Sequence, residues 1–148
     1  MKLYEYHLVR SVLREDAPLC CIRNTGQVYD YAMKHCYRDE DMWRESVWAI
    51  YVNRKNEIIG QYEVSKGGTA MAAIDKKIIC KVALEMMAEA VVLVHNHPSG
   101  DSRPSQADIE QTRQVKQALG LLDMQLLDHI IIGDDEYYSF GEEQVNKA

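Results

Sequence analysis

The stretch from Ala90 to Asp108 constrains the fold of this chain more than any other. It opens with an apolar run, residues 90–94, whose three valines favour a short buried strand. Pro98 cannot donate a hydrogen bond to a sheet, so the strand has to stop there. Because alternate side chains of a strand share a face, His95 and His97 point the same way. The sequence therefore predicts two imidazoles side by side at the end of a buried strand.

A carboxylate follows this strand end eleven positions after His97. Asp108 follows in the first turn of an expected helix. Two imidazoles and one carboxylate suit a catalytic zinc site, because three protein ligands leave the fourth tetrahedral position to water. A closed structural site would need a fourth ligand, usually sulfur, and the nearest cysteine in the sequence is Cys80. His95, His97 and Asp108 are therefore candidate ligands of Zn²⁺.

A purely structural interpretation of the same residues stays open. Ser105 and Asp108 fit the capping box S-x-x-D, in which a serine caps a helix and an acid hydrogen-bonds back to it. In that case Asp108 would bind no metal. For His95 and His97 the alternative is an ordinary core or surface histidine, and their spacing before Pro-Ser-Gly argues against it.

The charge of the chain limits its partners. Its 148 residues favour a single domain, and 23 acids against 17 bases give a net charge of −6. This balance argues against broad nucleic-acid binding, which depends on clustered Lys and Arg. Nucleic acid remains an option only through a local basic patch, for which Arg103, Arg113 and Lys116 are the candidates.

The cysteines and the apolar runs indicate the compartment. Cys20, Cys21, Cys36 and Cys80 suit neither a disulfide framework nor a C-x-x-C zinc motif, which favours a reducing, cytoplasmic setting. No signal peptide is visible, and the apolar runs are too short to cross a bilayer, so we expect no membrane association. The oligomeric state is not set by the sequence.

Periodicity and turn signals predict strands and helices that alternate through the middle of the chain. Strands are expected over residues 3–13, 45–53, 57–65, 90–94, 124–132 and 136–140, and helices over 24–37, 75–88 and 105–119. The last helix should end at Gly120 and bury Ile109, Thr112, Val115 and Leu119. The tail from Gly141 should fray or form a short helix. This alternation predicts a mixed sheet with helices on its faces.

Five residues reproduce the JAMM pattern: an upstream glutamate at Glu45, H-x-H at His95 and His97, then Ser105 and Asp108. The wording HNHPSGDSRPSQAD, with LLDHIIIG downstream, resembles the RadC branch of that group over about residues 43–140. The resemblance implies an α/β fold, an α/β/α sandwich with a mixed central sheet of the cytidine-deaminase-like JAB/MPN type. Residues 43–148 would form this domain, and residues 1–42 would add a strand and a helix packed on it.

The resemblance also implies a zinc-dependent hydrolase of peptide or isopeptide bonds, with zinc-bound water as nucleophile. Glu45 would be the general base, and Ser105 would steady the oxyanion. From its position alone, Glu45 could equally be a solvated acid at a strand start, with Glu40 and Asp41 as other candidate bases. The partner would be a peptide or protein substrate, which the sequence does not identify.

Neighbours of the site have weaker signals. His129, flanked by isoleucines, is expected to be buried and hydrogen-bonded rather than to bind metal. Asp101 or Asp128 could accept the second ring N–H of a zinc-bound histidine.

Other functions are weighed against the hydrolase. The RadC label suggests a DNA-repair-associated protein, but Gly26 is the only glycine before Gly60, so the helix-hairpin-helix module of many RadC-like proteins is not expected. A zinc-binding module without turnover also stays open. A zinc deaminase would need H-x-E and P-C-x-x-C, and the sequence has neither. Three consecutive residues cannot mimic an HNH nuclease, which spreads its motif over a long segment.

Overall fold

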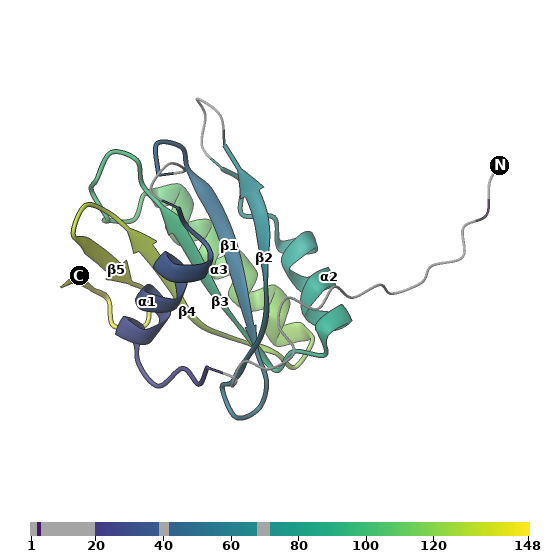
Figure 1. Ribbon diagram of the computed structural model, residues 1–148. Coiled ribbons are helices and arrows are strands. Elements are labelled where there is room, and N and C mark those ends of the chain that lie inside the picture. Colours follow the sequence, from purple (N-terminus) through teal and green to yellow (C-terminus); the bar gives the residue numbers. More distant parts are fainter. Residues whose placement is uncertain (1–2, 4–19, 39–41, 68–71) are drawn as a thin grey trace.

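The computed structural model describes residues 3, 20–38, 42–67 and 72–148. In this part of the chain, a six-stranded sheet has the order β2-β1-β3-β4-β5-β6 (Figure 1). The pair β3–β4 is parallel, and the other neighbouring pairs are antiparallel. The elements are α1 (Thr25–His35), β1 (Ser46–Val52), β2 (Ile58–Lys66), α2 (Lys76–Met86), β3 (Ala90–Asn96), α3 (Gln106–Leu121), β4 (Gln125–Ile132), β5 (Glu136–Ser139) and β6 (Gln144–Lys147).

Helices cover both faces of the sheet. Val28 and Ala32 of α1 pack in one apolar cluster with strand residues such as Ile50 and Val92. Residues of α2 and α3 form a second cluster with the alternate positions of the same strands. Figure 1 shows α1 in front of the sheet and α3 behind it. The predicted α/β/α sandwich with a mixed central sheet is confirmed.

β3 is the central strand and is buried at all seven positions. Its side chains divide between the two clusters: Val91 and Leu93 face α2 and α3, whereas Val92 and Val94 face α1. By this alternation His95 belongs to the α3 face. The buried strand therefore continues beyond the apolar run, through His95 to Asn96, and it ends before Pro98.

The helix starts are the ones that capping chemistry predicts. The side chain of Asn24 accepts from the Gln27 N–H at the start of α1, and Asp75 accepts from two N–H groups at the start of α2. Ser105 caps α3 in a complete capping box with Asp108. Because α3 starts directly after the loop that follows His97, this cap brings a carboxylate back to the end of β3.

Three expectations about the C-terminal half are wrong. Gly120 does not end α3, which runs on to Leu121. The space beside Gly120 is open, so this glycine costs the helix only the low helix propensity of glycine, about 1 kcal/mol relative to alanine. Ile109 is 44% exposed, because Asp108 takes the inward position ahead of Thr112, Val115 and Leu119. The tail from residue 141 contains β6, which pairs with β5.

Some expectations lie outside the described residues. These are the strand over 3–13, apart from Leu3, and the alternative bases Glu40 and Asp41. The division into residues 1–42 and 43–148 remains a prediction. Among the described helices, none has the length and apolar character needed to cross a membrane.

Candidate metal centre

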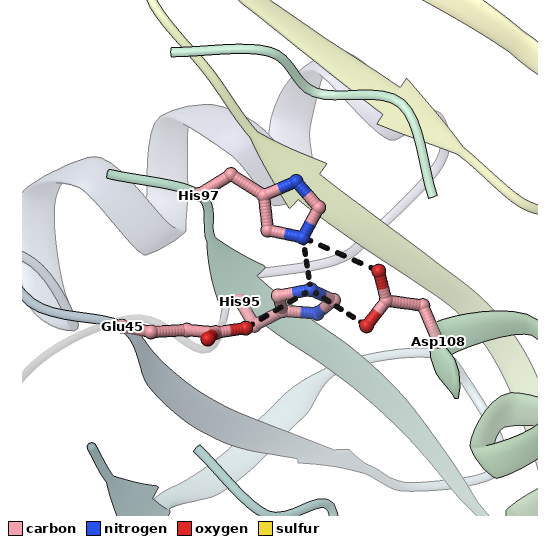
Figure 2. Close-up of side chains that lie close together, drawn as sticks. All are labelled: Glu45, His95, His97 and Asp108. Atoms are coloured by element: carbon pink, nitrogen blue, oxygen red, sulfur yellow. Dashed lines mark hydrogen bonds and ion pairs between the residues drawn. The ribbon is translucent and has the colours of Figure 1, made fainter. Parts of the chain in front are cut away.

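Four side chains from three parts of the sequence meet at one end of the sheet. His95 and His97 come from the end of β3, Asp108 from the first turn of α3, and Glu45 from the residue before β1 (Figure 2). One ligand atom from each lies within 4.8 Å of all the others. The structure thus brings together the three residues expected to bind zinc and the glutamate expected to be the base.

The separations of these atoms fit a tetrahedral ion. Nε2 of His95 lies 3.0 Å from Nε2 of His97 and 3.4 Å from Oδ1 of Asp108, and Nε2 of His97 lies 3.2 Å from Oδ2 of Asp108. Ligands at about 2.0–2.1 Å around a tetrahedral zinc are about 3.3 Å apart. Oε1 of Glu45 lies farther out, 3.8 Å from Nε2 of His95. This suits a group that acts beside the ion.

The hydrogen bonds of His97 leave one ring nitrogen for the centre. Its Nδ1 is 2.8 Å from the backbone carbonyl oxygen of Asp101, which can only accept, so Nδ1 carries a proton. In the neutral ring, Nε2 then presents a lone pair to the acceptor-only carboxylate of Asp108. Two acceptors at this distance need a cation or a proton between them. The donor set therefore fits a metal ion.

The pKa of His97 reflects this arrangement when no metal is bound. Burial lowers the pKa of the imidazole, but the contacts with the Asp108 carboxylate and the Asp101 carbonyl outweigh it and raise the pKa above its usual value. A proton can thus occupy part of the space that the donor set offers to a cation. A metal ion bound here would therefore compete with a proton for this histidine.

Asp108 serves the helix and the centre together. Its Oδ2 accepts the Ser105 N–H at 2.7 Å and also faces His97, while Oδ1 faces His95. Burial raises the pKa of this carboxyl, but the contacts with the imidazoles of His95 and His97 lower it by more than burial raises it. The pKa of Asp108 therefore lies well below its usual range. The capping and metal interpretations are therefore compatible.

Sheet pairing explains how Glu45 reaches residues 50 positions later. Val47 pairs with His95 in the antiparallel β1–β3 ladder, so two residues further along Glu45 lies across from His97. Its carbonyl accepts the Gly67 N–H, and its Oε2 accepts the Ala72 N–H at 3.3 Å. One carboxylate oxygen is thus held by the backbone, and the other faces the centre.

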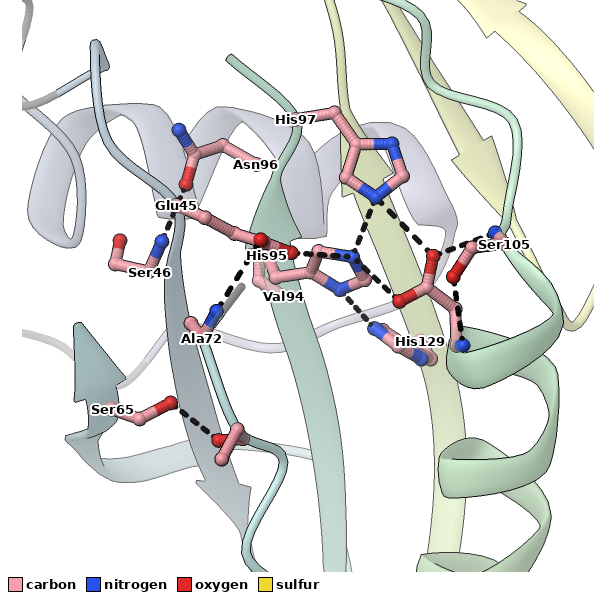
Figure 3. A network of polar contacts seen from close by, with 12 residues as sticks. Glu45, Ser46, Ser65, Ala72, Val94, His95, Asn96, His97, Ser105 and His129 are labelled. Atoms are coloured by element: carbon pink, nitrogen blue, oxygen red, sulfur yellow. Dashed lines mark hydrogen bonds and ion pairs between the residues drawn. The ribbon is translucent and has the colours of Figure 1, made fainter. Parts of the chain in front are cut away.

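Asn96 is a positioning residue that sequence reasoning missed. Its Oδ1 accepts the Ser46 N–H at 2.9 Å (Figure 3). Its Nδ2 donates to the carbonyl oxygens of Arg44 and Met42. These bonds hold the backbone on both sides of Glu45. The sequence signal that could have found Asn96 is an amide side chain between two histidines at the end of a strand predicted to be buried. A fully buried Asn, as the structure shows it to be, needs polar partners.

The loop between His97 and α3 is fixed against the β4–β5 turn. Ser102 is fully buried and donates from Oγ to Oε1 of Glu136 at 2.8 Å. Gly100 has φ +87°, and its carbonyl lies so close to Gly133 that a side chain there would collide with it. The loop therefore holds the Asp101 carbonyl against His97.

Ser105 lies at the rim of the centre with an exposed side chain. Its Oγ accepts the Asp108 N–H at 3.0 Å. A hydroxyl that accepts through a lone pair keeps its proton for donation. The cap and a hydrogen bond to a ligand can therefore coexist.

His129 is buried and hydrogen-bonded, as expected. Its Nε2 is 2.6 Å from Nδ1 of His95, and its Nδ1 is 2.7 Å from Oγ1 of Thr112. Burial, helped by the neighbouring His95, sets the pKa of His129 well below its usual value.

Neither carboxylate that was considered as a partner for a ligand imidazole has that role. Asp101 contacts His97 only through its backbone carbonyl. The carboxylate of Asp128 accepts from Ser139, Gly141 and the backbone N–H of residue 129.

Two of the three cations considered as a basic patch are already paired. Arg103 forms a two-pronged ion pair with Asp101, and Arg113 pairs with Glu110. All four side chains are largely exposed, so these pairs reduce the local positive charge without adding much stability.

Comparison with known proteins identifies the family. The model of the RadC-like JAB domain matches residues 22–145. A UPF0758 protein of Flavobacterium johnsoniae is 42% identical over 101 residues, 68% of this chain and 44% of the relative. A UPF0758 protein of Pelobacter propionicus is 42% identical over 119 residues, 80% of this chain and 51% of the relative. The chain spans about half the length of the curated relatives it matches. The sheet and the helices are consistent with the JAB/MPN type, and the chain belongs to the family of RadC-like JAB domains.

Proposed function

We propose that this chain is a zinc-dependent hydrolase of peptide or isopeptide bonds. The observation that carries the proposal is the convergence of Glu45, His95, His97 and Asp108 at one end of the sheet. His95, His97 and Asp108 are the proposed ligands, because their ring nitrogens and carboxylate oxygens lie 3.0–3.4 Å apart, close to the spacing around a tetrahedral zinc. Zinc, when bound, supplies a Lewis acid that polarises a carbonyl and lowers the pKa of water to near neutrality.

Glu45 is the proposed general base and acid. One of its oxygens is held by the Ala72 N–H, and the other is directed at the centre without lying at ligand spacing. From there the carboxylate can take a proton from the attacking water and return it to the leaving amine. A positioned acid–base group of this kind contributes about 10²- to 10⁴-fold to the rate.

Ser105 is the proposed donor to the oxyanion. Its hydroxyl is exposed at the rim of the centre, and the cap bond uses one of its lone pairs rather than its proton. The N-terminus of α3 adds a positive field at the same place. Loss of one such donor costs a few kcal/mol of barrier, about 10²- to 10³-fold in rate.

The test combines metal analysis with two substitutions. Purified protein is analysed for bound metal and assayed against a library of fluorogenic peptides and isopeptides. His97→Ala is expected to lose both zinc and hydrolysis. Glu45→Gln is expected to keep zinc and to lose at least about 10²-fold of the hydrolysis.

The matched control is Glu89→Gln, the same chemical change at an exposed carboxylate paired with Arg54. It should leave both measurements unchanged. Retained hydrolysis in Glu45→Gln would refute the role of Glu45. Zinc binding without turnover on any probe would leave a zinc-binding module and overturn the hydrolase proposal.

We further propose that the partner is a peptide or protein substrate and that the chain acts in the cytoplasm. The net charge of −6 and the pairing of Arg103 and Arg113 support a peptide over a nucleic acid. The four cysteines, all free, support a reducing compartment. An electrophoretic shift of duplex DNA that weakens with salt would instead support the DNA-associated alternative.

A further inference from the structure

A chain of buried hydrogen bonds runs behind the proposed ligands. Nδ1 of His95 is 2.6 Å from Nε2 of His129, and Nδ1 of His129 is 2.7 Å from Oγ1 of Thr112. Oγ1 of Thr112 is in turn 2.6 Å from the carbonyl oxygen of Asp108. The chain thus leaves one proposed ligand and returns to another, through two residues that do not face the metal position.

The direction of each bond follows from the Thr112 hydroxyl. A carbonyl oxygen can only accept, and two oxygens 2.6 Å apart require a proton between them, so Thr112 donates to Asp108. A hydroxyl has one proton. Towards the imidazole, Thr112 can therefore only accept, and Nδ1 of His129 must carry the proton of that bond.

The second ring nitrogen of His129 is then an acceptor. The ring is fully buried, it stacks on Phe140, and neither of its two hydrogen-bond partners is a carboxylate, so the neutral form is favoured. A neutral imidazole with a proton on Nδ1 has a lone pair on Nε2. The short bond to His95 must therefore be donated by Nδ1 of His95.

We propose that Thr112 and His129 are positioning residues that fix the tautomer of His95, so that its Nε2 lone pair points at the metal position. Nε2 of His95 faces His97 and Asp108. With the opposite hydroxyl orientation, each proton would move to the other ring nitrogen, and an N–H would point at the ion. The hydroxyl of Thr112 thus prepares a ligand on another element for coordination.

This inference rests on the proposed metal site, but the tautomers can be measured without metal. Long-range ¹H–¹⁵N spectra of histidine-labelled, metal-free protein distinguish protonated from unprotonated ring nitrogens. We expect a proton on Nδ1 and none on Nε2 of His129, and a proton on Nδ1 of His95. A proton on Nε2 of His129 would overturn the proposal whether or not the protein binds zinc.

Zinc affinity, measured by competition with a chromophoric chelator, tests the consequence. Thr112→Val keeps the shape of the side chain and removes the hydroxyl, and it is expected to weaken zinc binding about 10- to 100-fold. Thr112→Ser restores a hydroxyl and should restore most of the affinity. The control Tyr51→Phe removes another fully buried hydroxyl, one that donates to the Ile79 carbonyl, and should leave the affinity unchanged.

A double-mutant cycle separates this role from a general packing effect. In His129→Gln, the amide oxygen can accept from Nδ1 of His95 without help from Thr112. Adding Thr112→Val to His129→Gln should therefore cause little further loss. Equal losses from Thr112→Val in both backgrounds, or no loss in either, would show that Thr112 does not act through His129.

Discussion

The placement of Glu45 depends on Asn96, and this can be tested by replacing the amide. Asn96→Ala removes the acceptor for the Ser46 N–H and the donors to two backbone carbonyls. Asn96 is fully buried, and Ser46 is only 2% exposed. A buried polar group left without its partner costs about 1–3 kcal/mol. The orphaned carbonyls keep a second lone pair, so the Ser46 N–H dominates, and we expect a loss of about 2–3 kcal/mol in the free energy of unfolding.

Urea unfolding measures this loss, and a second substitution sharpens the result. Asn96→Asp keeps an acceptor for Ser46 but turns a carboxylate oxygen towards the carbonyls, so it should be at least as destabilising at neutral pH. The control Asn146→Ala, on the edge strand β6, should change stability by less than about 0.5 kcal/mol. If the Asn96→Ala protein were as stable as the original, the hydrogen bonds of Asn96 would not hold the backbone around Glu45.

The same variant separates the role of Asn96 from zinc binding. The side chain of Asn96, which lies between His95 and His97 in the chain, hydrogen-bonds to the backbone around Glu45 and not to the side chains of His95, His97 or Asp108. A displacement of a catalytic group by about 1 Å can cost about 10²-fold in rate. We therefore expect hydrolysis to fall about 10²-fold while zinc affinity changes little. A parallel loss of both would show that Asn96 supports the ligands themselves.

Four further predictions come from the same structure. Because the pKa of His97 is raised, zinc must displace a proton from His97 at low pH, so the zinc affinity measured by chelator competition should rise with pH until the pKa of His97 is passed. In metal-free protein, the bound proton stabilises the fold at low pH, and this stability is lost as the pH rises through the pKa of His97. Burial raises the pKa of Cys36 to about 12, so iodoacetamide should alkylate exposed Cys20 in native protein but Cys36 only after unfolding, as mass spectrometry would show. A Cβ on Gly133 would collide with the Gly100 carbonyl, so Gly133→Ala should lower the free energy of unfolding by about 1–3 kcal/mol in urea. Gly120→Ala, at an open helical position, should raise it by up to about 1 kcal/mol.

Local sequence was sufficient wherever one short segment carried the whole signal. The valine-rich run and Pro98 predicted a buried strand that ends at two histidines, and β3 has that form. The capping box predicted the start of α3, and Asp108 occupies it. These features depend on side-chain alternation and on hydrogen bonds within a few residues, so no knowledge of the rest of the chain was needed.

Position relative to distant segments could not be derived from local patterns. Glu45 reaches the centre because Val47 pairs with His95, a register that the sequence does not state. Ile109 was expected in the core, but Asp108 takes the buried position facing the histidines, and Ile109, the next residue of the helix, is exposed. The resemblance to RadC-like proteins pointed to Glu45 but did not explain why Glu45 lies beside the histidines.

The hydrogen-bond partners of the proposed metal ligands were decided by tertiary structure alone. Sequence proximity drew attention to the carboxylates of Asp101 and Asp128, whereas the structure gives His97 a backbone carbonyl and His95 the ring of His129. A buried polar atom bonds to whatever donor or acceptor the packing brings within about 3 Å, and that choice is made between elements far apart in the chain. The sequence by itself thus determined that His95, His97 and Asp108 gather at the end of β3, and the packing of β1, β4 and α3 decided how Glu45 joins them and how each side chain is oriented.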